Sequence, residues 1–230
     1  PQRSAQTMAP LRRREAAGLG QSPVLSLTGG ALLWIGLSGL VGGWALGATD
    51  DAATALLNHH FAACAGALCW ALIDRILRGR ASASGVMAGA LAGIAAIAAC
   101  AALVGSGGAM LIGGIAALLS RLGLGVLRRR VDDGAGIFVI HGLGGATGAL
   151  LLPLFVLPWL GGVGFEAGIS VTDALISQGI GLAVVALWAM VGSAIAALAV
   201  SVILPMRVTA QAEAEGLDAA QHGEQGWDFR

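Results

Sequence analysis

Six long apolar runs, separated by short polar segments, constrain the fold of this chain more than any other feature. They cover residues 24–47, 52–73, 83–104, 108–127, 137–160 and 172–204. Each run has close to the ~20 residues that an α-helix needs to cross a bilayer, and the sixth is longer than that. The runs predict an all-α membrane protein of about six transmembrane helices, the sixth of them tilted or projecting beyond the bilayer.

The composition supports this prediction. Hydrophobic residues make up 57% of the 230 residues, charged residues only 11%, and the mean hydropathy is +0.82. A soluble domain carries about a quarter charged residues, because it needs them to cover its surface. The net charge is zero, and the sequence has neither a basic face for nucleic acid nor an acidic tail. We therefore expect a lipid bilayer, and no nucleic acid, among the partners of this chain.

The arginines orient the predicted helices. With six spans both termini lie on one side, which then also carries the arginines at 12–14, 75–80, 128–130 and 207. The loops near 48–51, 105–107 and 161–171 contain no arginine, but hold Asp50, Asp51 and Glu166. The positive-inside rule places both termini in the cytoplasm, with the chain in the cell inner (plasma) membrane. A cytoplasmic segment at 1–23, a transmembrane domain at 24–205 and a cytoplasmic tail at 206–230 follow from this orientation.

Glycine spacing predicts how the helices pack. Gly85, Gly89 and Gly93 recur at intervals of four and therefore share one helix face. In a membrane, small residues let helix backbones approach closely, and dispersion packing then replaces the hydrophobic drive. A tightly packed helical bundle explains this pattern fully.

Ionisable residues inside a membrane span are costly and suggest function. Arg121 lies about two turns from the cytoplasmic end of the fourth run, so we expect its side chain to snorkel to the interface. His141 lies about a turn into the fifth run, followed by glycines that leave room beside it. A neutral imidazole both donates and accepts a hydrogen bond, which suits a narrow polar path. Spacing alone equally allows a histidine that is hydrogen-bonded within the bundle.

A second polar group lies in the second run. Asn58, His59 and His60 are consecutive, so at most two of them share a helix face. They either line an outer vestibule or are satisfied within the bundle. No carboxylate pair, phosphate-binding glycine loop or Cys/His metal spacing occurs in a polar segment. The sequence thus predicts no catalytic residue, no metal site and no cofactor, and we do not expect an enzyme.

Several segments resemble the ammonium transporter (Amt/Rh) family. Residues 131–133 (VDD) followed by 138–145 (FVIHGLGG) resemble the pattern around the family's tenth transmembrane helix. Residues 31–36 are similar to the start of helix six, and 58–70 to helix seven. In the tail, the matching residues are Gly216, Asp218, His222, Gly223 and Glu224. The resemblance extends from about residue 30 to residue 227, in the family's order.

The resemblance implies the second half of the family's inverted-repeat fold, helices six to eleven plus the cytoplasmic tail. It implies a homotrimer that moves ammonium or ammonia between the two halves. It assigns His141 and Phe138 to the pore, with the partner histidine on a fifth helix upstream of this chain. Leu56, Asn58 and His60 correspond to the outer vestibule. The tail is expected to contact a PII-type signal protein.

Departures from the family pattern put conduction in question. Residues 36–43 (GLSGLVGG) lack the aromatic residues and the asparagine of helix six. Leu56 replaces a phenylalanine, His60 a small polar residue and Gly136 an aspartate, and the final aromatic residue is Trp227 in place of tyrosine.

Three functional readings follow from this comparison. The first is ammonium transport, in which ammonium is deprotonated at the vestibule and conducted along a histidine-lined pore. The second is an ammonium-sensing or regulatory membrane module. The lost pore residues favour it, and a tail without an appended signalling domain opposes it. The third is a degenerate, non-conducting remnant. Because an isolated half would expose a polar pore wall to lipid, we expect the chain to need a partner half.

Overall fold

The computed structural model describes residues 22–127, 133, 136–205 and 208–224. Within these ranges the chain is helical and contains no strand. Five of the helices are long and apolar enough to cross a membrane, and a sixth apolar helix is shorter. The predicted all-α membrane fold is confirmed. Residues 1–21 of the predicted N-terminal segment, and Arg207 and Trp227 of the tail, lie outside the described residues.

Capping residues explain where the first two helices begin and end. α3 (Pro23–Gly43) starts after Ser22, whose hydroxyl accepts from the N–H of Leu25 at 3.3 Å. α4 (Asp50–Arg78) starts after Thr49, which accepts from the N–H of Ala52 at 3.4 Å. Two acidic residues in the first turn of α4 and two arginines in its last turn complement the helix dipole. The helix stops at Gly79, whose φ of 74° suits a residue without Cβ.

The third predicted span, 83–104, is only partly α-helical. α5 (Ala83–Ile97) has 15 residues, and the chain then continues in turns to Val104. In these turns Cys100 N–H donates to the Ile97 carbonyl and Leu103 N–H to the Cys100 carbonyl, both at 2.9 Å. The Asn58 side chain on α4 donates hydrogen bonds to the carbonyls of Ala101 and Val104 in these turns. Hydropathy alone does not reveal such an early end, because the turn residues are as apolar as the helix.

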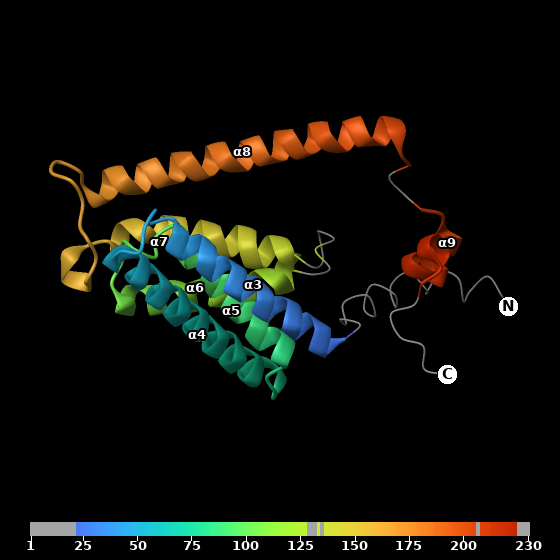
Figure 1. Ribbon diagram of the computed structural model, residues 1–230, viewed down its shortest axis with the longest axis horizontal. Helices are drawn as coiled ribbons and strands as arrows, with labels where there is room; N and C mark the ends of the chain where they lie inside the picture. Colours follow the sequence, from blue (N-terminus) through green and yellow to red (C-terminus); the bar gives the residue numbers. More distant parts are fainter. Residues whose placement is uncertain (1–21, 128–132, 134–135, 206–207, 225–230) are drawn as a thin grey trace. The chain divides into compact units, whose positions relative to one another are not determined.

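Glycines bring the centre of the bundle into backbone contact. α4 packs most extensively against α5 and α6 (Ser106–Leu127). A Cβ placed on Gly89 would collide with the carbonyl of Gly66, and one on Gly93 or Gly113 with the carbonyl of Ala62. The glycine face predicted on α5 is therefore a helix-packing face. Figure 1 shows the bundle that α3 to α7 form.

The fifth predicted span, 137–160, changes helix type along its length. A π-helix, η1 (Phe138–Leu143), leads into α7 (Gly144–Phe155), and a short 3-10 helix, η2 (Pro158–Leu160), follows. Gly148 lies so close to the Ala96 carbonyl of α5 that a Cβ there would collide with it. These contacts fix η1 and α7 against α5 and α6.

The chain divides into two units, residues 1–180 and 181–230. α8 (Val171–Ile203) has 33 residues, about 50 Å at 1.5 Å per residue, which exceeds a hydrocarbon core of about 30 Å. The expectation that this helix is longer than a bilayer requires is confirmed. The boundary between the units falls within α8. The second unit contains the rest of α8, then α9 (Ala210–Glu215), which is capped by Thr209, and the π-helix η3 (Asp218–His222).

Candidate functional site

The segment that carries His141 is a π-helix with a side-chain cap at its start. The two carboxylate oxygens of Asp133 accept from the N–H groups of Phe138 at 3.3 Å and Val139 at 3.2 Å. Gly136 between them has a φ of 70°, which other residues rarely adopt. Gly136 stands where the family pattern has an aspartate, and the absence of a Cβ suits this bend.

His141 is half-buried, and Phe138 on the same π-helix is 59% exposed. The Phe138 ring lies over Gly142, where a Cβ would come within 3.2 Å of its Cδ2 atom. Gly144, which follows η1 directly, packs against the Ala92 carbonyl of α5. The histidine and the phenylalanine thus lie on one short element whose far side is fixed to the bundle. Their assignment to a pore stays a prediction.

Asn58 is completely buried inside the bundle. Its Nδ2 donates to the carbonyls of Ala101 and Val104, both at 2.8 Å. These carbonyls belong to the turns after α5, so the amide supports the end of that segment. Its buried Oδ1 has no hydrogen-bond partner among the described residues, so the amide is satisfied within the bundle through its Nδ2 alone.

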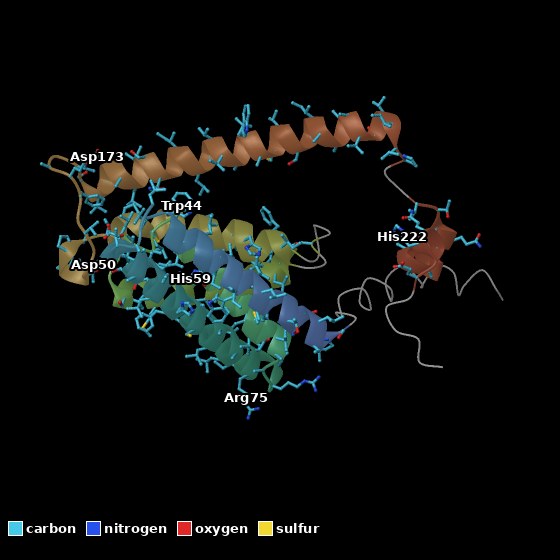
Figure 2. The ribbon with its side chains drawn as sticks, viewed as in Figure 1. Trp44, Asp50, His59, Arg75, Asp173 and His222 are labelled. Atoms are coloured by element: carbon cyan, nitrogen blue, oxygen red, sulfur yellow. The ribbon has the colours of Figure 1, made fainter. Side chains whose placement is uncertain are left out.

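The two histidines after Asn58 differ in environment. His60 is exposed, and its Nδ1 lies 2.8 Å from the Leu56 carbonyl. Its ring centroid is 5.8 Å from Trp34 and 5.5 Å from His59. His59 is completely buried among the helices (Figure 2), and neither of its ring nitrogens has a hydrogen-bond partner among the described residues.

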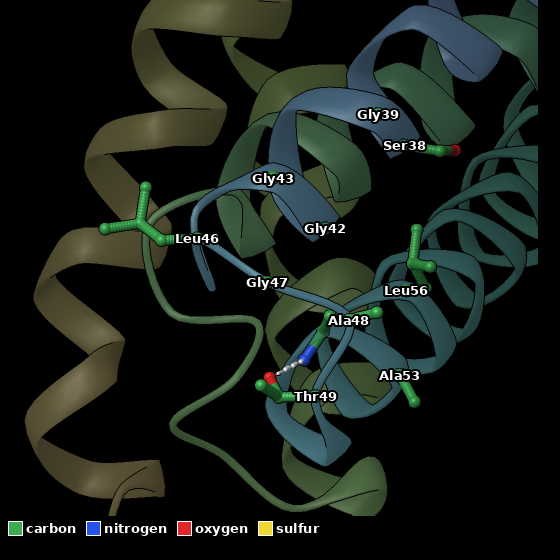
Figure 3. Close-up of a pocket in the computed structure, with 11 residues that line it drawn as sticks. Ser38, Gly39, Gly42, Gly43, Leu46, Gly47, Ala48, Thr49, Ala53 and Leu56 are labelled. Atoms are coloured by element: carbon green, nitrogen blue, oxygen red, sulfur yellow. Dashed lines mark hydrogen bonds between the residues drawn. The ribbon is translucent and has the colours of Figure 1, made fainter.

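A pocket of about 760 Å³ lies between the end of α3, the loop after it and the start of α4 (Figure 3). Leu56 is part of its wall, whereas Asn58, His60 and His141 are not. Glycine dominates the α3 side, so the pocket is wide and almost without polar side chains. The lining residues are Ser38, Gly39, Gly42, Gly43, Leu46, Gly47, Ala48, Thr49, Ala52, Ala53 and Leu56. This pocket therefore contains one of the predicted vestibule residues, Leu56, and neither of the predicted pore residues.

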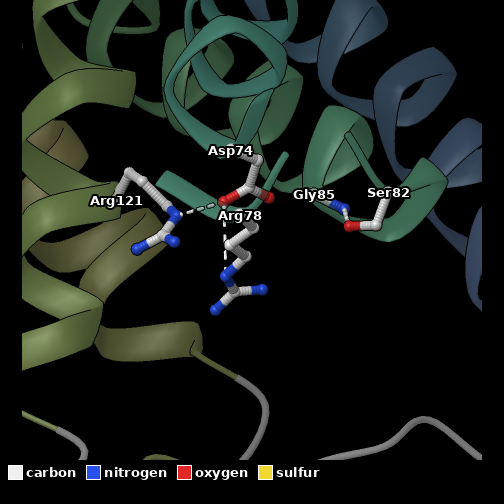
Figure 4. Close-up of polar contacts among 5 residues, drawn as sticks. All are labelled: Asp74, Arg78, Ser82, Gly85 and Arg121. Atoms are coloured by element: carbon white, nitrogen blue, oxygen red, sulfur yellow. Dashed lines mark hydrogen bonds and ion pairs between the residues drawn. The ribbon is translucent and has the colours of Figure 1, made fainter. Parts of the chain in front are cut away.

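Arg121 does not snorkel. It is only 7% exposed, and its Nε donates to Asp74 Oδ1 at 2.7 Å (Figure 4). Asp74 is also buried, and Arg78 Nε approaches the same carboxylate oxygen at 3.8 Å. The expectation is wrong because the second apolar run, 52–73, ends just before Asp74, so the hydropathy pattern does not place this carboxylate inside the bundle. In the structure α4 continues past it to Arg78, which places the carboxylate inside the bundle.

Sequence reasoning also missed Ser120. Its hydroxyl is completely buried and donates to the Val139 carbonyl of η1 at 3.0 Å. The available signal was the polar pair Ser120-Arg121 in the middle of an apolar run. Two adjacent helical residues point about 100° apart, so such a pair can reach two different neighbouring helices.

The family model described as "Ammonium Transporter Family" matches residues 4–227. The chain belongs to the ammonium transporter family. It is 34% identical over 203 residues to the ammonium transporter Amt1 of Archaeoglobus fulgidus, covering 87% of this chain and 51% of that protein. It is 30% identical over 221 residues to an ammonium transporter of Aquifex aeolicus, covering 95% of this chain and 52% of that protein. The chain thus spans about half the length of these relatives.

Solved structures give the same result for the fold. A structure titled "Sensor Amt Protein" superimposes with a TM-score of 0.79 at 26% identity, over 87% of this chain and 49% of that one. Candida albicans Mep2 superimposes with a TM-score of 0.74 at 26% identity, over 83% of this chain and 44% of that one. The resemblance inferred from the VDD…HG and tail motifs is confirmed, and the chain is a multi-pass membrane protein of the ammonium transporter family.

Proposed function

We propose that this chain is the second half of an ammonium-conducting unit, with both termini in the cytoplasm of a cell bounded by its inner (plasma) membrane. The observation that carries the proposal is the match of nearly the whole chain to the ammonium transporter family, with His141 on the family's histidine motif. Its curated relatives are named ammonium transporters. We further propose that the unit assembles as a homotrimer, like the family that its motifs resemble.

In this proposal NH₄⁺ gives up a proton at the outer vestibule, near Leu56 and His60, and NH₃ passes His141 and Phe138. The half-buried position of His141 leaves one side of its ring free of the bundle, as a pore-lining residue requires. A neutral imidazole offers one donor and one acceptor, and so it replaces part of the hydration of a small polar molecule without adding a charge.

Uptake of labelled methylammonium by cells that lack other ammonium transporters tests this role. The wild-type protein is compared with His141→Ala and, as a control, with Ser201→Ala, whose hydroxyl donates to the Leu198 carbonyl of its own helix. We expect His141→Ala to lower or abolish uptake, and Ser201→Ala to leave it within about twofold. Loss of a positioned polar contact costs about 1–3 kcal/mol, or one to two orders of magnitude in rate. Equal uptake by the wild type and His141→Ala would rule out the proposed role.

A sensor is the second candidate function, and one observation favours it. The chain superimposes on the structure titled "Sensor Amt Protein" with a TM-score of 0.79. In that case the wild-type protein binds ammonium without taking up methylammonium. An ammonium-dependent rise in its unfolding temperature, in a protein that shows no uptake, would favour the sensor.

We also propose that the tail at 206–230 contacts a PII-type signal protein. Its described part has two short helices, separated by Gly216 with a φ of 95°, and exposed residues at His222, Gly223 and Glu224. Deletion of residues 208–224 should abolish co-purification with the cognate PII protein at low ATP and 2-oxoglutarate. Glu224→Gln tests whether the carboxylate matters within an intact tail. Retention of the PII protein by the deletion variant would exclude this site.

A further inference from the structure

The peptide groups of Val139 are held by two side chains that lie outside η1. Asp133 Oδ2 accepts from the Val139 N–H at 3.2 Å, and Ser120 Oγ donates to the Val139 carbonyl at 3.0 Å. Ser120 and Val139 are both completely buried, so water does not compete for the second bond. Val139 lies two residues before His141 and is the point at which the π-helix is fastened to α6.

These two hydrogen bonds matter because the π-helix is less stable than an α-helix of the same residues. Its hydrogen-bond pattern is rare in proteins and occurs mostly at functional sites. Successive residues of an α-helix rotate by about 100°, so a slip of one residue between the π and α registers would turn the His141 ring to another face. A partner that holds the Val139 carbonyl therefore also determines where His141 points.

Ser120 is itself held in place by its neighbour. Arg121 donates to Asp74 of α4 at 2.7 Å, which ties this turn of α6 to the middle of the bundle (Figure 4). Gly123, one turn further along α6, lets η1 approach. A Cβ there would lie 2.8 Å from Leu143 Cδ2 and 3.5 Å from Val139 Cγ1. The line of contacts thus runs from α4 through Arg121 and Ser120 to the turn that carries His141.

We infer that Ser120 is a positioning residue for His141: its buried hydrogen bond to the Val139 carbonyl keeps η1 in the π register and so directs the imidazole. The importance of this arrangement for conduction rests on the proposed function. The arrangement itself does not.

Carbethoxylation of His141 by diethyl pyrocarbonate tests the inference without any reference to transport. The reagent is small, enters membranes and modifies accessible imidazole nitrogens. The rate at His141 is measured by peptide mass spectrometry for the protein in lipid vesicles, with His222 on the tail as an internal reference. The variants are Ser120→Ala, which removes the donor, and Ser120→Cys, which keeps a weak donor of similar size. Ser201→Ala is the control, because among the described residues that hydroxyl donates only to the Leu198 carbonyl of its own helix.

We expect Ser120→Ala to raise the His141 rate about fivefold relative to His222, as loss of a net ~1 kcal/mol hydrogen bond implies. Ser120→Cys should lie between the wild type and Ser120→Ala, and Ser201→Ala should equal the wild type. A Ser120→Ala rate at or below the wild-type rate, or an equal rise in Ser201→Ala, would overturn the inference. A wild type without methylammonium uptake would overturn the proposed function alone, because the modification rate would still report the orientation of His141.

Discussion

At the residue scale, the buried ion pair of Asp74 and Arg121 is the feature that the sequence pattern did not predict. The two residues are 47 positions apart and lie on α4 and α6, within 2.7 Å of each other. Hydropathy places Asp74 just after the second apolar run and Arg121 within the fourth, and it does not relate the two residues to each other. A linear pattern shows how far a charge is from the end of a span, but not which helix packs beside it.

Removing one partner of this pair should destabilise the protein more than removing both. Arg121→Met leaves the carboxylate buried without its main partner, at a cost of about 3–5 kcal/mol. Asp74→Leu combined with Arg121→Met removes both charges and should recover most of that loss. Thermal unfolding in detergent measures the difference. The control is Arg75→Met. Among the described residues, the exposed guanidinium of Arg75 donates a hydrogen bond to the nearby Gly79 carbonyl. Equal stability of Arg121→Met and the control would show that the pair is not structurally important.

At the element scale, glycine spacing predicted close helix packing, and the structure shows which glycines take part. Gly113 of α6 lies against the Ala62 carbonyl of α4, whereas a Cβ on the adjacent Gly114 would meet no described atom of another helix within 4 Å. The two are indistinguishable in the sequence. The helix type around His141 was equally hidden, because a π-helix and an α-helix have the same hydropathy.

These adjacent glycines form a matched pair for a test of packing. Gly113→Ala must push α6 away from the α4 backbone, so it should lower the unfolding temperature by several degrees. Gly114→Ala meets no obstacle and should leave the temperature unchanged or raise it, because alanine favours a helix by about 1 kcal/mol over glycine. Purified protein, heated in one detergent with tryptophan fluorescence as the readout, provides the comparison. A larger loss in Gly114→Ala would contradict the packing described for α6.

At the scale of the whole molecule, the distribution of arginine predicts the orientation in the membrane. The segments around 75–80 and 128–130 carry arginines, and the loops at 105–107 and 161–171 carry none. Reporter fusions test this prediction in the intact cell. Green fluorescent protein should fluoresce when fused after residue 80 or 130. Alkaline phosphatase should be active only when fused after residue 106 or 166. Active phosphatase after residue 80 would invert the proposed orientation.

The sequence by itself determined the membrane class, the approximate spans, the orientation prediction and the family, because hydropathy and motif order are properties of the linear chain. Only the tertiary structure decided that α5 ends early, that Arg121 pairs with Asp74, and that Ser120 holds the carbonyl before His141. Each of these depends on which atoms of two distant segments lie next to each other in the folded chain. Such proximity is set by helix rotation and register, and residues distant in the sequence leave no pattern of it.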